Sequence, residues 1–300
     1  MTIVTVRAPA KINLDLRVGP VGDDGYHPVA TVYQAIALYD EIKARPAEPG
    51  EFTVTVTGEG HDVLPLDDSN IAVGAARALA AKHGVDEGVA LSIHKTIAVA
   101  GGLAGGSADA AGALVACDAL WGTRAAREEL AAIASDLGSD VPFCLVGGNA
   151  VGTARGDQLS PVLGRGMYQW VLAYADDGLS TADVYREYDR LANSPPREPK
   201  LSDDLLAALR SGDPYIVGAA MHNDLQAAAL RLRPSLARTL GVGADADALA
   251  SMVSGSGPTV LFLAADDDHA VDIAVALSGS GTCRTVQRAH GPVPGARVVG

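Results

Sequence analysis

The chain has 300 residues, of which 48% are hydrophobic, 4% aromatic and 20% charged, and its formal net charge at pH 7 is -13. This length predicts two packed domains or one large α/β unit with a sizeable core. The acidic balance, without a cluster of Lys and Arg, argues against a nucleic-acid partner, and the lack of about 18 uninterrupted apolar residues argues against a membrane span.

The first hundred residues predict mainly strands. Alternating polar and apolar residues, or β-branched and aromatic ones, predict strands over residues 3–18, 31–37 and 52–57. Ser69 or Asn70 can cap a helix over 71–82, and Gly84 is placed to end it. Another short strand is predicted around residues 89–95.

Helices are predicted in the middle of the chain. A glycine cluster leads into a helix over 107–120 that Gly122 follows, and a second helix over about 124–137 has Gly138 as its stop. Three later segments are a Pro-rich surface connection at 194–199, a helix start at Asp213-Pro214, and a glycine-rich loop at 254–258 before a strand over 259–263.

The strongest chemical signal is the segment 95–111, which reads KTIAVAGGLAGGSADAA. Glycines let the backbone approach an anion closely, and a following helix offers unpaired N-terminal amides and the positive end of its dipole. The segment matches neither of two common phosphate-binding patterns. Ser107 stands where the P-loop pattern requires lysine, and no G-x-G-x-x-G pattern of dinucleotide-binding proteins begins at Gly101 or Gly102. The segment alone predicts either phosphate binding or a flexible turn.

Two further segments each allow a chemical and a structural interpretation. Lys11, Asn13 and Asp15 alternate along the first predicted strand, so they are expected on one face, lining a polar cavity or facing water. Asp140, within the Leu137–Phe143 segment, lies between a helix end and a possible new helix, where it can cap that helix or act in catalysis.

Together these segments resemble the GHMP kinases over nearly the whole chain. Pro9–Leu14 resembles the first motif of the family, Gly101–Ser107 the second and Ser254–Thr259 the third. The resemblance implies an α/β (α+β) fold of two domains with the active site in the cleft between them. We place the boundary near residue 160, giving an N-terminal domain 1–160 with the ATP-binding loop and a C-terminal domain 161–300.

Within the family, the segments Asp23–His27 and Leu137–Phe143 are similar to segments that mark the enzymes that phosphorylate a cytidylated methylerythritol. The resemblance implies transfer of the ATP γ-phosphoryl to the 2-hydroxyl of the methylerythritol unit, in non-mevalonate isoprenoid precursor biosynthesis. It also implies four substrate-binding residues, of which the aromatic ones enclose the cytosine: Asn13, Tyr26, His27 and Tyr185.

The resemblance also implies roles for the polar residues of the motifs. Asp140 accepts the hydroxyl proton, while Lys11 keeps Asp140 ionised and neutralises charge on the transferring group. Magnesium is expected with ATP, with ligands that the sequence leaves unassigned. The implied nucleotide-binding residues are Asn70, Lys95, Ala98, Val99, Ala100, Gly101, Gly102, Leu103, Ala104, Gly105, Gly106, Ser107 and Ala108.

Three alanines depart from the usual wording of the nucleotide loop. Ala98 stands where proline is common, Ala104 replaces a glycine and Ala108 replaces a second serine. Ala104 therefore needs ordinary backbone angles or some strain, and Ala108 removes a hydroxyl that can touch phosphate or metal. The backbone amides are unaffected, so nucleotide binding is expected to survive.

Several alternatives stay open. Another GHMP kinase, acting on homoserine, mevalonate or a sugar, shares the three motifs but not the Asp23–His27 and Leu137–Phe143 segments. A catalytically silent nucleotide-binding regulator is expected to lack Lys11 or Asp140, and both are present. The odd number of cysteines and an N-terminus without a secretory apolar core predict a cytoplasmic protein. A monomer or a homodimer is expected.

Overall fold

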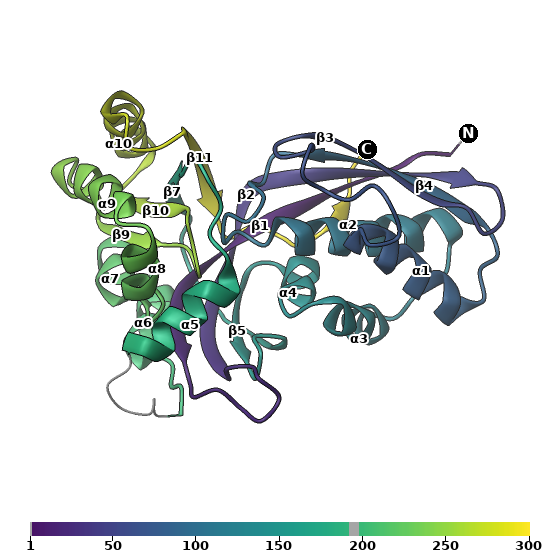
Figure 1. Cartoon of the computed structure of the whole chain (residues 1–300), viewed down its shortest axis with the longest axis horizontal. Helices are drawn as coiled ribbons and strands as arrows, with labels where there is room; N and C mark the ends of the chain where they lie inside the picture. The colour runs from purple at the N-terminus through teal and green to yellow at the C-terminus, as the bar shows by residue number, and fades with distance from the viewer. Residues whose placement is uncertain (1, 192–197) are drawn as a thin grey trace.

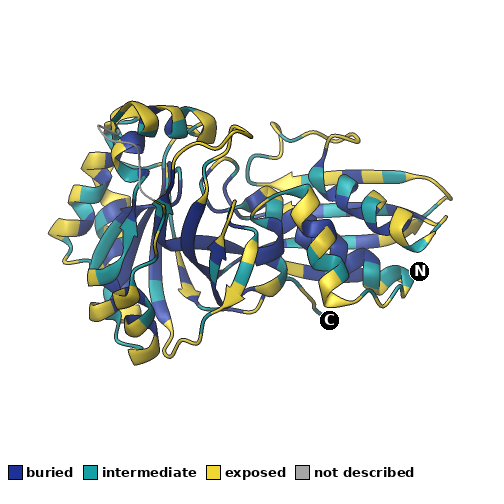
Figure 2. Ribbon diagram, turned by 90° about the horizontal axis from the view of Figure 1, so that it is seen from below, coloured by how far each residue is buried: buried dark blue, intermediate teal, exposed yellow. Residues whose placement is uncertain are grey.

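The computed structural model describes residues 2–191 and 198–300 and has two lobes, each built on its own β-sheet (Figure 1). One lobe carries the first strands with helices α1 to α4, and the other carries helices α5 to α10. Strands β1 (Val4–Val18) and β2 (Val29–Ala47) are long and reach the region where the lobes meet. Figure 2 shows buried backbone continuing through this junction.

The first sheet has the strand order β12-β1-β2-β4-β3, with β5 added beside β2, β6 beside β5 and β8 beside β1. Its other strands are β3 (Phe52–Gly58), β4 (Gly88–Lys95), β5 (Asn149–Thr153), β6 (Gln158–Pro161), β8 (His222–Asn223) and β12 (Arg297–Val298). The helices that cover it are α1 (Ile71–His83), α2 (Gly105–Trp121), α3 (Arg127–Leu137) and α4 (Val141–Val146).

Helix α2 is central to this lobe because it packs against both β1 and β2. Ten of its residues are buried, most of them alanine or glycine. At Gly112 an added Cβ would lie 2.4 Å from Cδ1 of Ile42, so a side chain there would separate the helix from the sheet. The alanine- and glycine-rich composition therefore allows the close packing of helix on sheet.

The second sheet is antiparallel, with the order β11-β7-β10-β9. Its strands are β7 (Tyr168–Tyr174), β9 (Ala250–Val253), β10 (Val260–Ala264) and β11 (Thr285–Gly291). The helices of this lobe are α5 (Thr181–Leu191), α6 (Asp203–Ser211), α7 (Pro214–Ala220), α8 (Gln226–Leu232), α9 (Ser235–Asp245) and α10 (Asp267–Ser280). Phe262 and Ile273 belong to a second hydrophobic core between this sheet and its helices.

The predicted fold class is confirmed, and most predicted elements exist with shifted ends. The strand expected over 31–37 extends over all of β2. Asn70 caps α1 by accepting from the backbone of Ala72, and Gly84 ends this helix in the left-handed conformation. Helix α3 begins at Arg127, later than expected, and Arg124 just before it has a φ of 53°, which is not helical.

Two observations bear on the placement of the domain boundary. The second sheet starts at Tyr168, close to the predicted boundary near residue 160, but β8 and β12 return from the C-terminal half to pair with β1.

The predicted Pro-rich connection at 194–199 lies largely outside the described residues. Among the residues that are described, no helix is both long and apolar enough to cross a membrane.

Candidate active site

The three motifs meet around a cleft of about 320 Å³ that both lobes line. Lys11 and Asn13 come from β1, Asp140 from the start of α4, and Tyr185 from α5. The glycine-rich loop and the third motif supply the remaining backbone: Ala98, Ala100, Gly101, Gly102, Ala104, Gly105, Gly106, Gly255 and Ser256. Residues far apart in the sequence thus share one solvent-accessible space.

Lys11 and Asp140 face each other in this cleft. The Lys11 Nζ lies 3.5 Å from Oδ2 of Asp140, and the two side chains are 8% and 26% exposed. The same Nζ donates to Oδ1 of Asn13 at 2.9 Å, and Asn13 in turn donates to the hydroxyl of Thr31 at 2.8 Å. The ammonium is therefore held in place beside the carboxylate.

Asp140 makes no side-chain capping bond to α4, although it occupies the N-cap position. Its Oδ1 accepts a hydrogen bond of 3.1 Å from the hydroxyl of Tyr33 instead. The structural interpretation, a helix cap, is therefore not realised, and the carboxylate stays available for chemistry at the cleft.

Tyr33 is a site residue that the sequence reasoning missed. It lies directly opposite Asn13 in the β1–β2 pairing, so a correct strand register would have been the signal. Burial raises the pKa of the Tyr33 hydroxyl well above its usual value, and the neighbouring charge of Asp140 raises it further. The phenol therefore stays protonated at neutral pH and donates to the carboxylate.

The glycine-rich loop presents backbone to the cleft at the N-terminus of α2. Ala104, the residue before the helix, has the left-handed angles φ 59° and ψ 37°, so the strain expected at this alanine is present. Leu103 and Ala108 are fully buried, which directs their side chains into the core and not into the cleft. A serine hydroxyl at position 108 would accordingly be enclosed by protein.

The third motif packs tightly against the glycine-rich loop. The hydroxyl of Ser254 donates to the carbonyl of Gly102 at 3.1 Å, and an added Cβ at Gly102 would lie 2.2 Å from the Ser254 carbonyl. Asn223 donates to the carbonyls of Val253 and Gly255, both at 2.8 Å. Asn223, to which we assigned no chemistry, thus holds the third motif in position.

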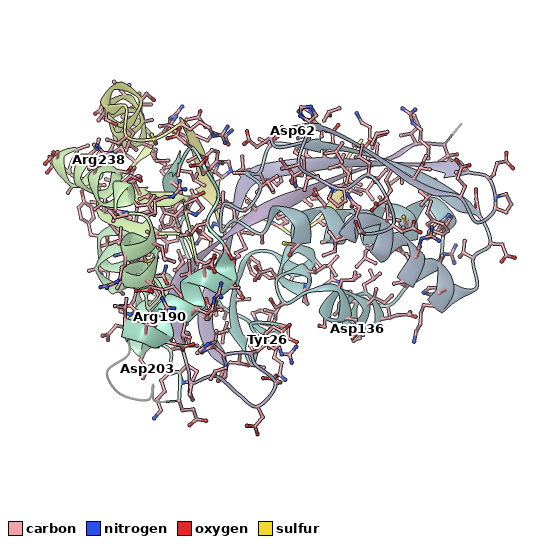
Figure 3. All side chains as sticks on the ribbon, in the orientation of Figure 1. Tyr26, Asp62, Asp136, Arg190, Asp203 and Arg238 are labelled. Carbon is pink, nitrogen blue, oxygen red and sulfur yellow. The ribbon has the colours of Figure 1, made fainter. Side chains whose placement is uncertain are left out.

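The residues expected at the cytidine end form two packed pairs, one of two tilted rings and one of a ring with a cation. The rings of His27 and Tyr185 are 5.0 Å apart, and the His27 Nδ1 lies 2.9 Å from the carbonyl of Gly19. Tyr26 is exposed on the β1–β2 loop (Figure 3). The guanidinium of Arg155 lies 4.1 Å from the centre of its ring. Arg155 lines the cleft and was also missed, because it lies outside the motifs.

Two of the expected nucleotide-binding residues, Asn70 and Lys95, have side chains that bond to other groups of the protein. Asn70 accepts from Ala72 and donates to the carbonyl of Pro65. Lys95 is 1% exposed in its side chain and its ammonium bonds to protein oxygens beneath the glycine-rich loop. This geometry supports a contact of Lys95 with the loop, whereas a contact of its side chain with nucleotide stays a prediction.

The expected shared face of Lys11, Asn13 and Asp15 is interrupted. The strand register shifts between Asn13 and Asp15, and Asp15 is absent from the residues that line the cleft. Asp15 instead accepts from Arg17 at 2.7 Å, and burial raises the pKa of its carboxyl. The β-bulge therefore separates a structural carboxylate from the cleft residues.

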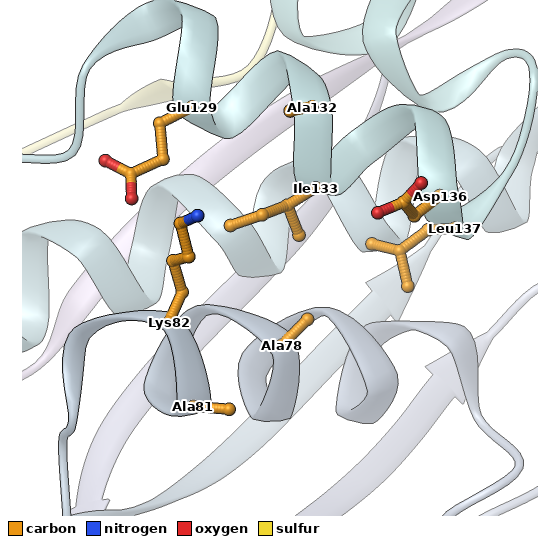
Figure 4. Close-up of a pocket in the computed structure, with 8 residues that line it drawn as sticks. All are labelled: Ala78, Ala81, Lys82, Glu129, Ala132, Ile133, Asp136 and Leu137. Atoms are coloured by element: carbon orange, nitrogen blue, oxygen red, sulfur yellow. The ribbon is translucent and has the colours of Figure 1, made fainter.

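A larger groove of about 590 Å³ lies between α1 and α3, away from every predicted site residue (Figure 4). Its charged side chains are Lys82, Glu129 and Asp136, and its floor is made of alanines with Ile133 and Leu137. A still larger groove of about 690 Å³ is lined by Ala98, Val99, Ala100 and Gly101 at the start of the glycine-rich loop. The groove between α1 and α3 contains none of the motif residues, whereas the Lys11–Asp140 pair and the rest of the loop line the smaller cleft.

The two-lobed fold and the cleft lined by the glycine-rich loop are those of a GHMP kinase, and comparison with known proteins agrees with this class. The family model of the GHMP kinases N terminal domain matches residues 70–148, and that of the GHMP kinases C terminal matches residues 205–283. A homoserine kinase structure from Cytophaga hutchinsonii shares the fold, with a TM-score of 0.77 at 20% identity, and covers 100% of this chain and 98% of its own. At that identity the likeness concerns the fold alone.

Two similar proteins narrow the class further. The 4-diphosphocytidyl-2-C-methyl-D-erythritol kinase of Thermobifida fusca is 55% identical over 99% of both chains. A crystal structure of 4-(cytidine 5'-diphospho)-2C-methyl-D-erythritol kinase has a TM-score of 0.77 at 30% identity and covers 95% of this chain and 98% of its own. The chain belongs to the GHMP kinases and, within them, to the 4-diphosphocytidyl-2-C-methyl-D-erythritol kinase family.

Proposed function

We propose that this enzyme transfers the γ-phosphoryl group of ATP to the 2-hydroxyl of 4-(cytidine 5'-diphospho)-2-C-methyl-D-erythritol, a step of non-mevalonate isoprenoid precursor biosynthesis. The observation that carries the proposal is the Lys11–Asp140 pair, 3.5 Å apart, in a cleft lined by the glycine-rich loop. A base and a cation beside an array of backbone amides suit phosphoryl transfer, which depends mainly on positioning and charge.

The nucleotide phosphates are assigned to the loop 98–108 at the N-terminus of α2. Gly105 and Gly106 begin the helix, and both line the cleft. The first amides of a helix have no partner within it, and its dipole favours an anion at this end. ATP is the expected nucleotide because GHMP kinases use it.

Asp140 is assigned to take the proton from the attacking hydroxyl. Its side chain is 26% exposed, so an alcohol can approach it, while the hydrogen bond from Tyr33 and the ion pair with Lys11 fix its orientation. As the hydroxyl oxygen bonds to the γ-phosphorus, its proton passes to the carboxylate and ADP leaves with the electrons of the broken bond. Lys11 places positive charge where the transferring group is negative.

Recognition of the cytidine end is assigned to Tyr26, His27 and Tyr185. The rings of His27 and Tyr185 pack against each other at a tilt of 32°, and Tyr26 carries the guanidinium of Arg155 on its ring. A flat base is well suited to such aromatic surfaces, and displacing the cation from Tyr26 exposes one of them. Asn13 contacts Lys11 and lines the cleft, so a role in substrate binding is consistent with its position.

Magnesium is part of the proposal, and the cleft fits an ion held mainly by the nucleotide. No group of three or more His, Cys, Asp or Glu side chains that could hold a metal occurs within residues 2–191 and 198–300. Magnesium usually binds through one or two carboxylates together with substrate phosphates and water, and Asp140 is the carboxylate that lines this cleft. The ion would supply positive charge that neutralises the phosphates.

We further propose that the enzyme acts in the cytoplasm. Cys117, Cys144 and Cys283 are free thiols. Free thiols are typical of a reducing compartment, and they support this assignment. A monomer or a homodimer without a nucleic-acid partner remains our prediction.

The proposal is tested by measuring ADP release with ATP, magnesium and each of three alcohols: the cytidylated methylerythritol, homoserine and mevalonate. We expect release with the cytidylated substrate alone, and its loss in Asp140→Asn, which keeps the shape of the side chain but removes the base. Turnover of homoserine or mevalonate would refute the substrate assignment. Full activity of Asp140→Asn would refute the role of the base.

A further inference from the structure

Beneath the glycine-rich loop lies a buried cluster of three charged residues from three different elements. Lys95 ends β4, Asp40 lies on β2 and Asp109 lies on α2, and their side chains are 1%, 0% and 6% exposed. The Lys95 ammonium donates to Asp40, to Oδ2 of Asp109 at 2.6 Å and to the carbonyl of Gly105 at 3.1 Å. The three N–H groups of the ammonium therefore have three oxygen acceptors.

The cluster fixes both ends of the loop. At the start of the loop, Oδ1 of Asp40 accepts from the backbone amides of Thr96 at 2.6 Å and Ile97 at 2.9 Å. At the far end, Lys95 bonds Gly105, the first residue of α2, and Asp109 attaches the same ammonium to that helix. The separation of the loop ends is thus set by one lysine and its two carboxylates.

The loop in turn touches the catalytic strand. The carbonyl of Leu103, within the loop, accepts a 3.1 Å hydrogen bond from the backbone amide of Lys11. A displacement of the start of α2 would therefore reach both the amides assigned to phosphate and the backbone that carries Lys11.

The charges of the cluster do not suit a purely stabilising role. Two carboxylates share one ammonium in a buried space, and Oδ1 of Asp109 has no hydrogen-bond partner. An unpartnered buried oxygen and a second buried carboxylate both cost stability. A lysine with Asp40 alone would be a balanced pair, so the second carboxylate calls for another explanation.

We propose that Asp109 is a positioning residue for nucleotide binding, which acts through Lys95 to hold the N-terminus of α2 at the distance that ATP requires. This inference rests on the proposed function. It assigns to Asp109 no contact with nucleotide or substrate, and it requires an oxygen acceptor for Lys95 at this position.

The test compares Asp109→Leu, which removes the acceptor and keeps the branched shape of the side chain, with Asp109→Asn, which keeps an acceptor oxygen. We expect the KM for ATP and the Kd for ADP to rise roughly tenfold in Asp109→Leu, as for other small displacements of positioning groups. The KM for the alcohol substrate should change little. The thermal midpoint should change little, because the loss of one acceptor for the Lys95 ammonium is offset by the removal of a second buried carboxylate. Asp109→Asn should bind ADP nearly as the unchanged protein does.

Asp118→Ala is the matched control on the same helix. Asp118 accepts from Thr123 at 2.6 Å and from the backbone of Ala125 at 2.9 Å, at the opposite end of α2. Its replacement should lower the thermal midpoint and leave ADP binding unchanged. If Asp109→Leu does not fold, Asp109→Ala provides the same comparison, with an expected loss in the same direction.

ADP binding, measured by calorimetry on the full chain, distinguishes a failure of the proposed function from a failure of the positioning role. An unchanged protein that binds no ADP would refute the proposed function itself. Binding by the unchanged protein together with unaltered binding by Asp109→Leu would overturn the positioning role alone. The role would also be overturned if Asp109→Asn bound as weakly as Asp109→Leu, or if Asp118→Ala lost as much affinity.

Discussion

Replacing Tyr33 by phenylalanine tests whether the phenol orients the Asp140 carboxylate. Tyr33 is fixed without its hydroxyl: its ring packs 4.9 Å from Phe143, and it is 3% exposed. Tyr33→Phe therefore removes the 3.1 Å hydrogen bond to Asp140 and leaves the packing in place. The change isolates one donor to the proposed base.

The size of the effect follows from the partner of this bond. A hydrogen bond to a charged group is worth about 1.5–3 kcal/mol when the site is shielded, and Asp140 is partly open to solvent, so we expect the lower end. About 1.4 kcal/mol corresponds to a tenfold change in rate. We therefore expect kcat to fall about tenfold, with little change in the KM for ATP, because the bond does not touch the nucleotide loop.

The assay is steady-state ADP release, with Tyr168→Phe as the matched control. Tyr168 is also buried and donates its hydroxyl to the carbonyl of Arg165 at 3.0 Å, in the second sheet and outside the cleft. It should lose a similar hydrogen bond without a change in kcat. An unchanged kcat in Tyr33→Phe, or an equal fall in both variants, would refute the orienting role of Tyr33.

Three further outcomes are expected. Ala104→Gly should raise the free energy of unfolding by about 1 kcal/mol in chemical denaturation, since glycine relieves the left-handed strain, and it should keep ATP turnover; no gain in stability would contradict the strain. Gly102→Ala should lower that free energy by roughly 2 kcal/mol and weaken ATP binding, because its Cβ would meet Ser254 at 2.2 Å; a variant as stable and active as the parent would show that the two loops can separate. Burial raises the pKa of Tyr185 to about 12 and also raises that of Tyr33, so the neutral phenols stabilise the fold fully below about pH 10, and this contribution should be lost as the pH rises toward 12; alkaline denaturation curves that stay flat between these values would contradict it.

The motifs could be predicted from sequence because their chemistry is local. Glycines before a helix are compatible with an anion site, and the alternation of Lys11 and Asn13 along a strand predicts that both lie on one face. The alternation left open whether that face lines a cavity or faces water, and in the structure both residues line the cleft. Asp140 was harder, because a carboxylate before a short helix is usually a cap. Its free side chain becomes visible only when Tyr33 and Lys11 are brought to it.

What sequence could not supply depends on register and on long-range packing. The bulge after Asn13 turns Asp15 away from the cleft, and the sequence of the strand contains no pattern that predicts this register shift. Asp40 and Asp109 are 69 positions apart (109 − 40) and meet only through Lys95, so their cluster cannot be deduced from spacing. The pairing of β12 with β1 likewise joins the two ends of the chain.

The most direct test of the central claim is the proton-coupled ³¹P NMR spectrum of the product formed from ATP and the cytidylated methylerythritol. The 2-carbon of the methylerythritol unit bears a methyl group and no hydrogen, so a phosphate on its oxygen has no proton three bonds away. We predict a new phosphomonoester singlet that appears with ADP and is missing with Asp140→Asn. A doublet or a triplet would place the phosphate on another hydroxyl, and the absence of any new ester signal would contradict the assigned activity.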